Sequence, residues 1–278
     1  MPLSPELRHL AVDLPACPRT LLQLLPLLDD DGASLAAMAA VVEADMALAS
    51  AVVRTVNSAM FGLLRRVDSV GEAMRHLGMH EVAALTYATA LRAAFAPTPQ
   101  LDRLWERAAL RGLLMGRSAP ALGLEPWRAH TAGLFAQSGQ AVLLARSAGA
   151  YLPLLQRCGC DPAALLQAEL AEFGVTHAVY GSALCAAWGL HNEVVKYVRE
   201  HVAEPAGWQV RPEPLRNLLL LGHLADQLID GGEPDALARA AAPGSGWTAE
   251  QLHLALAAPW RQLSAARSAA PREGGHAP

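Results

Sequence analysis

Apolar residues recur at helical spacing along almost the whole chain, and no run alternates convincingly between apolar and polar residues as a half-buried strand would. Between residues 45 and 62, one face of a helix would carry five of them: Ala49, Val52, Val53, Val56 and Met60. A hydrophobic content of 53% over 278 residues is enough for one large or two modest cores. The pattern therefore predicts an all-α protein.

Helix boundaries are clearest in the N-terminal part of the chain. Asp45 can accept from the free amides at the start of the central helix, which Gly62 can end. Ser69 and Glu72 have the spacing of a capping box, and Gly78 can end the short helix that follows. We interpret these residues as structural.

Two adjacent polar residues, Asn57 and Ser58, lie on or beside the apolar stripe of the central helix. There they would compete with backbone hydrogen bonds unless they had a fixed partner. We expect both to form a structural tie within the N-terminal part of the chain, not to bind a ligand.

Four short motifs in this order resemble the opening half of an HDOD domain, a bacterial signalling module related to the HD and HD-GYP phosphohydrolases. They are Leu14-Pro-Ala-Cys-Pro18, Asp45-x-x-Leu48, Asn57-Ser-Ala59 and Ser69-x-x-Glu-Ala-x-x-x-Leu-Gly78. The resemblance runs from about residue 10 to residue 229, and it implies an all-α fold of two helical lobes with a signalling role.

Two prolines at 97 and 99 mark the expected boundary between the lobes, because they end helices and stiffen the connection. We expect a helical N-terminal lobe (1–97), a degenerate HD-like lobe (100–230), a helical extension (231–267) and a disordered tail (268–278). In the second lobe, helices are predicted over 101–119, 127–148, 162–172, 176–188, 192–202 and 214–229.

The resemblance implies a place for metal ligands, because HD phosphohydrolases gather histidines and carboxylates around divalent ions that acidify a water. Arg107 stands where the first histidine is expected, and Ala136 and Gln137 replace the His-Asp pair. Only His177, His201 and Asp226 match the remaining ligand positions. We expect these three to point inward as a hydrogen-bonded polar cluster, with no metal, no cofactor and no catalytic residue.

The resulting expectation is a non-catalytic regulatory module that binds another signalling protein, such as a receiver, kinase or cyclic-dinucleotide protein, or a small ligand. One alternative is a residual phosphohydrolase on nucleotides or cyclic dinucleotides that uses the three retained ligand residues. The other is a transcriptional regulator that binds DNA through the helix pair of residues 34–60, although Arg54 is the one cation of its second helix.

Composition and charge bear on the binding partners and the cellular compartment that we expect for this protein. A net charge of −4 and a pI near 6.2 argue against broad contact with nucleic acid. The uncharged stretch 173–192 is interrupted by glycines and polar residues, so it predicts a buried helix and no membrane span. Four cysteines without a paired framework and no cleavable signal suggest free thiols in a bacterial cytoplasm: Cys17, Cys158, Cys160 and Cys185.

Overall fold

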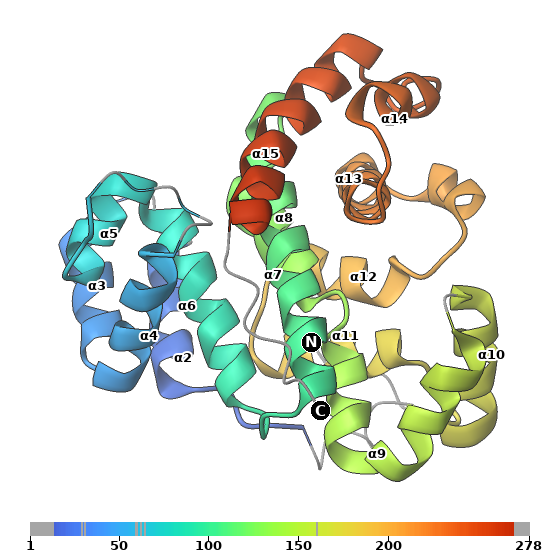
Figure 1. The fold of residues 1–278 in the computed structure, drawn as a ribbon, viewed down its shortest axis with the longest axis horizontal. Helices are drawn as coiled ribbons and strands as arrows, with labels where there is room; N and C mark the ends of the chain where they lie inside the picture. Colours follow the sequence, from blue (N-terminus) through green and yellow to red (C-terminus); the bar gives the residue numbers. More distant parts are fainter. Residues whose placement is uncertain are drawn as a thin grey trace.

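The computed structural model describes residues 14–269 except 29, 31, 59–60, 62, 64 and 160, and this part of the chain contains helices and no strand. The predicted all-α class is confirmed. Figure 1 shows a first group of helices on one side of the molecule. This first lobe consists of α2 (Arg19–Leu28), α3 (Leu35–Glu43), α4 (Met46–Val56), α5 (Val70–Leu77) and α6 (Met79–Ala93).

The second lobe begins with α7 at the centre of the molecule (Figure 1), where Thr98 caps the helix and Pro99 occupies its first turn. Its α-helices are α7 (Pro99–Ser118), α8 (Pro126–Phe135), α9 (Ser138–Cys158), α10 (Pro162–Phe173), α11 (His177–Ala187), α12 (Asn192–Glu200) and α13 (Glu213–Ile229). Two short 3₁₀ helices join them, η3 (Pro120–Leu122) and η4 (Pro205–Val210).

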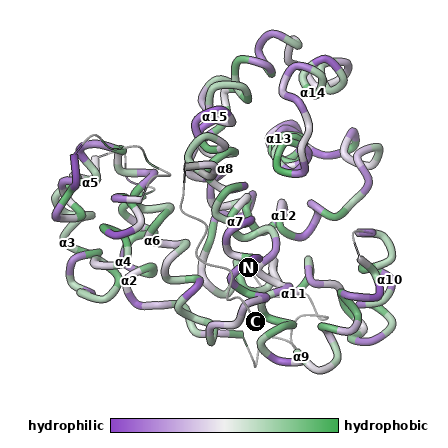
Figure 2. Tube along the Cα trace, viewed as in Figure 1, coloured by the Kyte–Doolittle hydropathy of each residue, from purple (hydrophilic) through white to green (hydrophobic). Residues whose placement is uncertain are grey.

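A C-terminal pair of helices, α14 (Pro234–Ala241) and α15 (Ala249–Ala269), returns the chain to α7 and η3. The predicted tail falls outside the described residues except for Ser268 and Ala269, which end α15. Met60 and Gly62, expected at the end of the central helix, also lie outside them. Figure 2 shows apolar and polar residues alternating along the helices, as expected where one face of a helix is buried.

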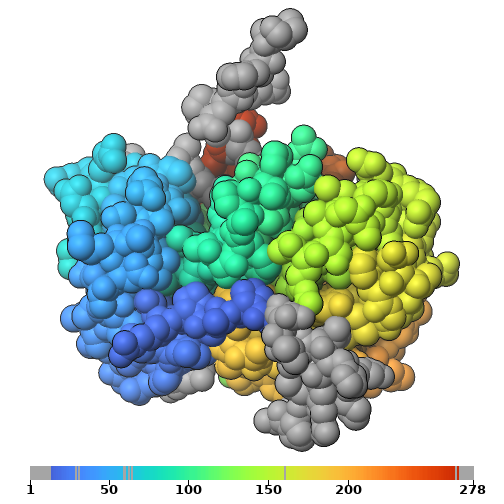
Figure 3. Space-filling view, turned by 90° about the horizontal axis from the view of Figure 1, so that it is seen from below, coloured from blue at the N-terminus to red at the C-terminus, as the bar shows by residue number. Residues whose placement is uncertain are grey.

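The two lobes share one continuous apolar core, and the N-terminal segment ties them together. The Trp188 indole of α11 donates to the Pro15 carbonyl oxygen over 2.9 Å, while the Tyr87 hydroxyl of α6 donates to the Leu21 carbonyl oxygen over 3.2 Å. In Figure 3 this dark blue segment runs across the underside of the molecule from the first lobe toward the second. The motif at residues 14–18 thus joins both lobes.

Glycines allow several helices to approach unusually closely. A Cβ added to Gly116 of α7 would lie 2.9 Å from His130 Cβ of α8, and one added to Gly133 would lie 2.7 Å from Met115 Sδ. One added to Gly139 of α9 would lie 1.8 Å from the His177 carbonyl oxygen of α11. Real Cβ atoms do not approach backbone this closely, so α9 and α11 can pack as they do only with glycine at position 139.

The single helix predicted over 127–148 is wrong. Gln137 leaves helical geometry (φ −103°, ψ 14°), so α8 ends at Phe135 and α9 starts at Ser138. α9 then continues to Cys158, with a kink at Ser147. Both segments keep their apolar spacing across the break, which turns α9 so that Gly139 lies against α11. A periodicity argument does not detect such a change of direction.

No single described helix has the length and apolar content to cross a membrane. α3 and α4 meet those two criteria only when taken together, and they are bent by 116° at their junction.

Replacing Gly139 by alanine is expected to destabilise the protein by about 3 kcal/mol or more, because the added methyl group meets backbone that cannot move aside. Chemical denaturation measures the change. Gly149→Ala is the matched control: it lies on the same helix with nothing within 4 Å of the added Cβ. That variant is expected to gain about 0.5–1 kcal/mol from helix propensity. Equal stability of the two variants would contradict the close contact.

Candidate functional site

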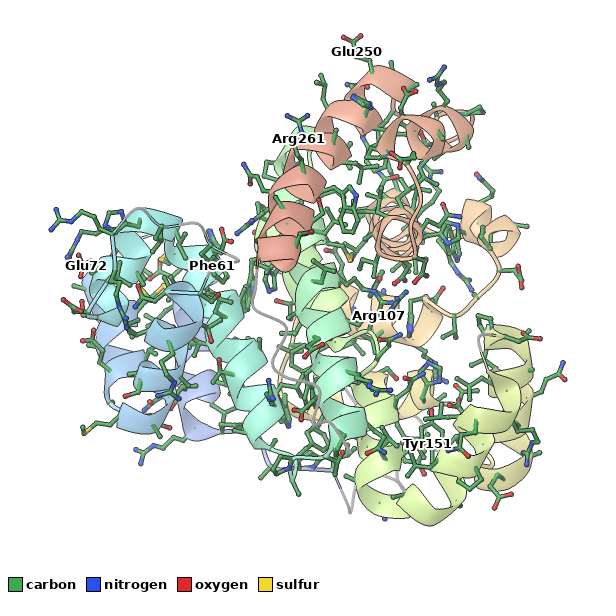
Figure 4. All side chains as sticks on the ribbon, in the orientation of Figure 1. Phe61, Glu72, Arg107, Tyr151, Glu250 and Arg261 are labelled. Carbon is green, nitrogen blue, oxygen red and sulfur yellow. The ribbon has the colours of Figure 1, made fainter. Side chains whose placement is uncertain are left out.

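The first predicted ligand residue, His177, begins α11 and is held by an acid from α10. Its backbone amide donates to Glu169 Oε2 over 2.8 Å, and its Nδ1 lies 2.9 Å and 2.8 Å from the two carboxylate oxygens. The Tyr151 hydroxyl of α9 (labelled in Figure 4) donates to Glu169 Oε1 over 2.6 Å. Since a carboxylate only accepts, His177 Nδ1 carries the proton of this contact.

The Glu169 carboxylate is fully buried yet ionised. Burial by itself would raise its pKa, but hydrogen bonds from His177, the His177 charge and the Tyr151 hydrogen bond hold the pKa below its ordinary value. In return, burial and the neighbouring carboxylate raise the pKa of Tyr151. The three groups form a satisfied polar cluster inside the second lobe.

The second predicted residue, His201, caps the C-terminus of α12 beside His177. The two rings lie edge to face with centroids 5.8 Å apart, and the His201 ring stacks on Tyr197 at 5.9 Å. His201 Nδ1 lies 2.8 Å from the Val198 carbonyl oxygen, to which it donates. Burial first, then the charges of His177 and Arg111, lower the pKa of His201 to about 3, so its ring is neutral near pH 7.

The third predicted residue, Asp226 of α13, is bound by two arginines of α7. Arg107 Nη2 donates to Asp226 Oδ1 over 3.2 Å, and Arg111 donates to the same oxygen through Nε over 2.9 Å and through Nη2. Arg107 also donates to both oxygens of Asp230 over 2.6 Å and 2.9 Å. In Figure 4 Arg107 lies on the side of α7 that faces α12 and α13.

Charge pairing dominates this contact between α7 and α13. The Asp230 hydrogen bond is the main cause of the raised pKa of Arg107, and Arg107 in turn lowers the pKa of Asp230. The Arg111 side chain is only 3% exposed, so its charge depends on Asp226 for compensation.

The expectation that the three residues point inward together is only partly met. His177 and His201 are in ring contact, but Asp226 is directed to the arginines and shares no hydrogen bond with either histidine within the described part of the chain. Arg107 stands at the position of the first expected ligand, and it donates a hydrogen bond to Asp226, the last expected ligand.

These donors do not fit a dinuclear metal centre. Across the described ranges, no three histidine, cysteine, aspartate or glutamate side chains converge as a metal would require. His177 donates its Nδ1 proton to Glu169, which leaves only its Nε2 as a ligand atom, and Asp226 is neutralised by guanidinium groups. Ala136, at the position of the expected namesake histidine, is fully buried and has no ligating atom.

Sequence reasoning missed two central residues, Glu169 and Arg111. Arg111 follows Arg107 by four positions, so the spacing places both on one helix face, a usable signal. Glu169 had only a weak signal, as one of two acids in the apolar stretch 162–173, and its partner His177 belongs to the next helix.

The structural motif residues lie in the first lobe, away from this cluster. Asp45 Oδ1 accepts from the Leu48 amide over 3.0 Å, and Gly78, with φ +86°, separates α5 from α6. The Asn57 side chain donates to the Val67 carbonyl oxygen over 2.8 Å and accepts from the Val67 amide over 2.9 Å. These two bonds fasten the end of α4 to the segment that leads into α5.

The tie expected of Ser58 has a different outcome. Its side chain is exposed and forms no hydrogen bond with any other residue that the structure describes. Asn57 forms hydrogen bonds with Val67, whereas the Ser58 side chain does not. Ser58 instead lines a cleft between the lobes.

A histidine of α8, His130, lines the same cleft and fills the notch between Gly112 and Gly116. Only 5% of its surface is exposed. Burial, followed by the charge of Arg117, lowers its pKa to about 3.

Comparison with known proteins agrees with this fold. The HDOD domain family matches residues 14–204, more than half of the chain, so this protein belongs to the HDOD family. An uncharacterised protein of Treponema pallidum (strain Nichols) is 25% identical over 227 residues, covering 80% of this chain and 44% of the relative. The chain thus spans less than half the length of that relative.

Two crystal structures show the shared fold. One, a protein of Shewanella amazonensis SB2B provisionally described as a phosphohydrolase, has a TM-score of 0.72 at 21% identity and covers 94% of this chain and 98% of its own. The other, a protein of Marinobacter aquaeolei VT8 provisionally described as a signal transduction protein, has a TM-score of 0.72 at 22% identity and covers 92% and 59%.

The Asn57→Ala variant is expected to lose about 1–3 kcal/mol of unfolding free energy, because the Val67 amide and carbonyl both lose their partner. Thermal and urea denaturation provide the measurement. Ser58→Ala, one residue further on, is the control and is expected to change stability by less than about 0.5 kcal/mol. An unchanged melting temperature for Asn57→Ala would exclude the tie.

The lowered pKa of His130 predicts acid sensitivity. His130 binds a proton near pH 6.5 in the unfolded chain but only near pH 3 in the folded chain. The contribution of neutral His130 to the free energy of unfolding is therefore fully present above pH 6.5 and is lost as the pH falls from 6.5 to 3. Replacing His130 by glutamine is expected to flatten the dependence of unfolding free energy on pH by up to about 1.4 kcal/mol per pH unit in this window. His80→Gln, at an exposed position, serves as control and should leave the slope unchanged.

Proposed function

We propose that this HDOD protein is a non-catalytic regulatory module of bacterial signal transduction, which acts by binding another protein or a small ligand. One observation carries the proposal: Arg107 and Arg111 are hydrogen-bonded to Asp226, the retained acid of the ligand pattern. Guanidinium charges therefore occupy the place at which an HD phosphohydrolase would need its metal.

The two kinds of cation differ in what they can do. A divalent metal ion has coordination positions for water and lowers the pKa of that water, which creates the attacking hydroxide. A guanidinium group stays protonated and only donates hydrogen bonds. It can neutralise a carboxylate and hold two helices together, but it cannot supply a nucleophile. The cluster is accordingly suited to joining α7 and α13.

The partner we infer is another signalling protein, such as a receiver, a kinase or a cyclic-dinucleotide protein, in the bacterial cytoplasm. The shared fold with a provisionally described signal transduction protein supports this role. Cys17, Cys158 and Cys185 are free thiols, which supports a reducing compartment.

A residual phosphohydrolase is the second candidate, favoured by the fold shared with the Shewanella protein. It would have to bind metal through the Nε2 atoms of His177 and His201 and through Asp226, and Asp226 is already hydrogen-bonded to Arg107 and Arg111. DNA binding through α3 and α4 has less support, because Arg54, the basic residue in the last turn of α4, lines the cleft between the lobes.

Protein purified without chelator is expected to contain no stoichiometric transition metal, as measured by elemental mass spectrometry. After loading with Mn²⁺ it is expected not to hydrolyse bis(p-nitrophenyl) phosphate, because no bound water is activated.

A stoichiometric metal that is lost in the double variant His177→Ala with His201→Ala would overturn this proposal. The double variant His76→Ala with His80→Ala, outside the cluster, controls for general loss of histidines. Because His177 is buried, its replacement can also disrupt the fold. The single variant His201→Ala is therefore measured as well, and circular dichroism shows whether each variant is folded.

A further inference from the structure

A cleft of about 880 Å³ lies between the two lobes. One wall comes from α4 and α6 of the first lobe, and the other comes from α7 and α8 of the second. In Figure 1, α6 and α7 lie next to each other at the junction of the lobes. The volume falls within the range of about 300–1,000 Å³ that is typical of small-molecule sites.

The lining of the cleft is amphipathic. Its apolar part consists of buried leucines, Trp105 and Ile229 with small residues between them: Ala51, Leu85, Ala88, Trp105, Ala109, Leu110, Leu113, Leu134, Ile229 and Ala266. Hydroxyl groups are supplied by Thr55, Ser58 and Thr89. Such a surface can hold a flat apolar body and accept or donate hydrogen bonds around it.

Charge in the cleft is strongly biased. Four arginines line it (Arg54, Arg92, Arg103 and Arg107), against a single carboxylate, Glu106, among its described lining residues. This contrasts with the whole chain, which carries a net charge of −4. A concentration of positive charge in a concave site attracts anions.

Two of these arginines are already engaged and two are not. Arg107 is bound to Asp226 and Asp230, and Arg92 forms an exposed ion pair with Asp102. Arg54 of the first lobe and Arg103 of the second are exposed and have no carboxylate partner in the described ranges. The available donors thus come from opposite walls.

We propose that this cleft binds a small organic anion of nucleotide size, with two or more negative charges and an apolar ring. The assignment rests on the proposed function, for which it supplies the input ligand. Arg54 and Arg103 would bind the anionic groups from the two walls, and the leucines would contact the ring. Two arginines without a carboxylate partner do not make the extended basic groove that a nucleic-acid strand requires.

Binding in this position would join the lobes through the ligand. Arg107 and Ile229 also line the cleft, so the cleft adjoins the contact between Arg107, Asp226 and Asp230. Occupancy can therefore act on both the junction of the lobes and the α7–α13 ion pairs.

A second cavity, of about 940 Å³, lies between the first lobe and α15, and Phe61 lines it (Figure 4). Its arginine, Arg117, is paired with Glu81 and lies over the Phe61 ring. We assign no ligand to it because its positive charge is already neutralised.

Isothermal titration calorimetry of the full chain with each of the four common ribonucleoside diphosphates at low ionic strength tests the proposal. At least one is expected to bind with one site per chain and to bind more weakly as salt is added. The corresponding uncharged nucleoside and inorganic pyrophosphate test the two halves of the ligand, and both should bind at least about tenfold more weakly.

The double variant Arg54→Ala with Arg103→Ala is expected to weaken binding at least about tenfold, since each charge-assisted hydrogen bond contributes more than a neutral one. The matched control is Arg75→Ala with Arg261→Ala, which removes two exposed arginines that do not line the cleft. It should retain the affinity of the parent protein. Thermal unfolding of each variant verifies the fold.

Three outcomes would overturn the assignment: no binding of any nucleotide, equal weakening in both double variants, or equal affinity for pyrophosphate. The titrated samples are then analysed by chromatography for hydrolysis. A bound and intact nucleotide supports both proposals. A bound and hydrolysed one keeps the cleft but overturns the non-catalytic function, whereas the absence of both binding and hydrolysis overturns the cleft alone.

Discussion

The close contact between α7 and α8 is the constraint on which the rest of the structure depends. Gly112 and Gly116 leave a notch that His130 fills, and a Cβ at Gly133 would lie 3.0 Å from Gly112 Cα. Because the helices meet at backbone distance, α7 has little freedom to rotate or slide. The other faces of α7 are therefore fixed in direction: one contacts α13, one contacts α15 and one contacts the first lobe.

Two sites follow from that orientation of α7. Arg107 and Arg111 reach Asp226 of α13, while Arg103 lies in the cleft opposite α4. A buried ion pair contributes little net stability, because the cost of desolvating the charges offsets their attraction, but removing one partner leaves an uncompensated charge. The arginines therefore fix the register of α7 on α13. Both proposals, regulation without hydrolysis and an anion in the cleft, depend on this one helix.

Much of the fold could be predicted from local signals. Asp45 caps α4, Ser69 Oγ accepts from the Glu72 amide as in a capping box, and the apolar spacing predicted most of the helices. The break at Gln137 was missed, because a change of chain direction leaves the periodicity unaltered. For the site, His177, His201 and Asp226 were expected from the resemblance, but Glu169 and Arg111 were not, since their importance lies in contacts between helices.

By itself the sequence determined the helical class and the helix caps, since these depend on residue types and short spacings. Tertiary structure alone decided which charges meet. Arg111 and Asp226 are far apart along the chain, as are Arg54 and Arg103, and only helix packing brings the first pair into contact and the second to opposite walls of one cleft. The physical reason is that the role of a guanidinium group depends on its neighbours. Beside an aspartate its charge is neutralised and it joins two helices, whereas without a carboxylate partner it is free to bind an anion.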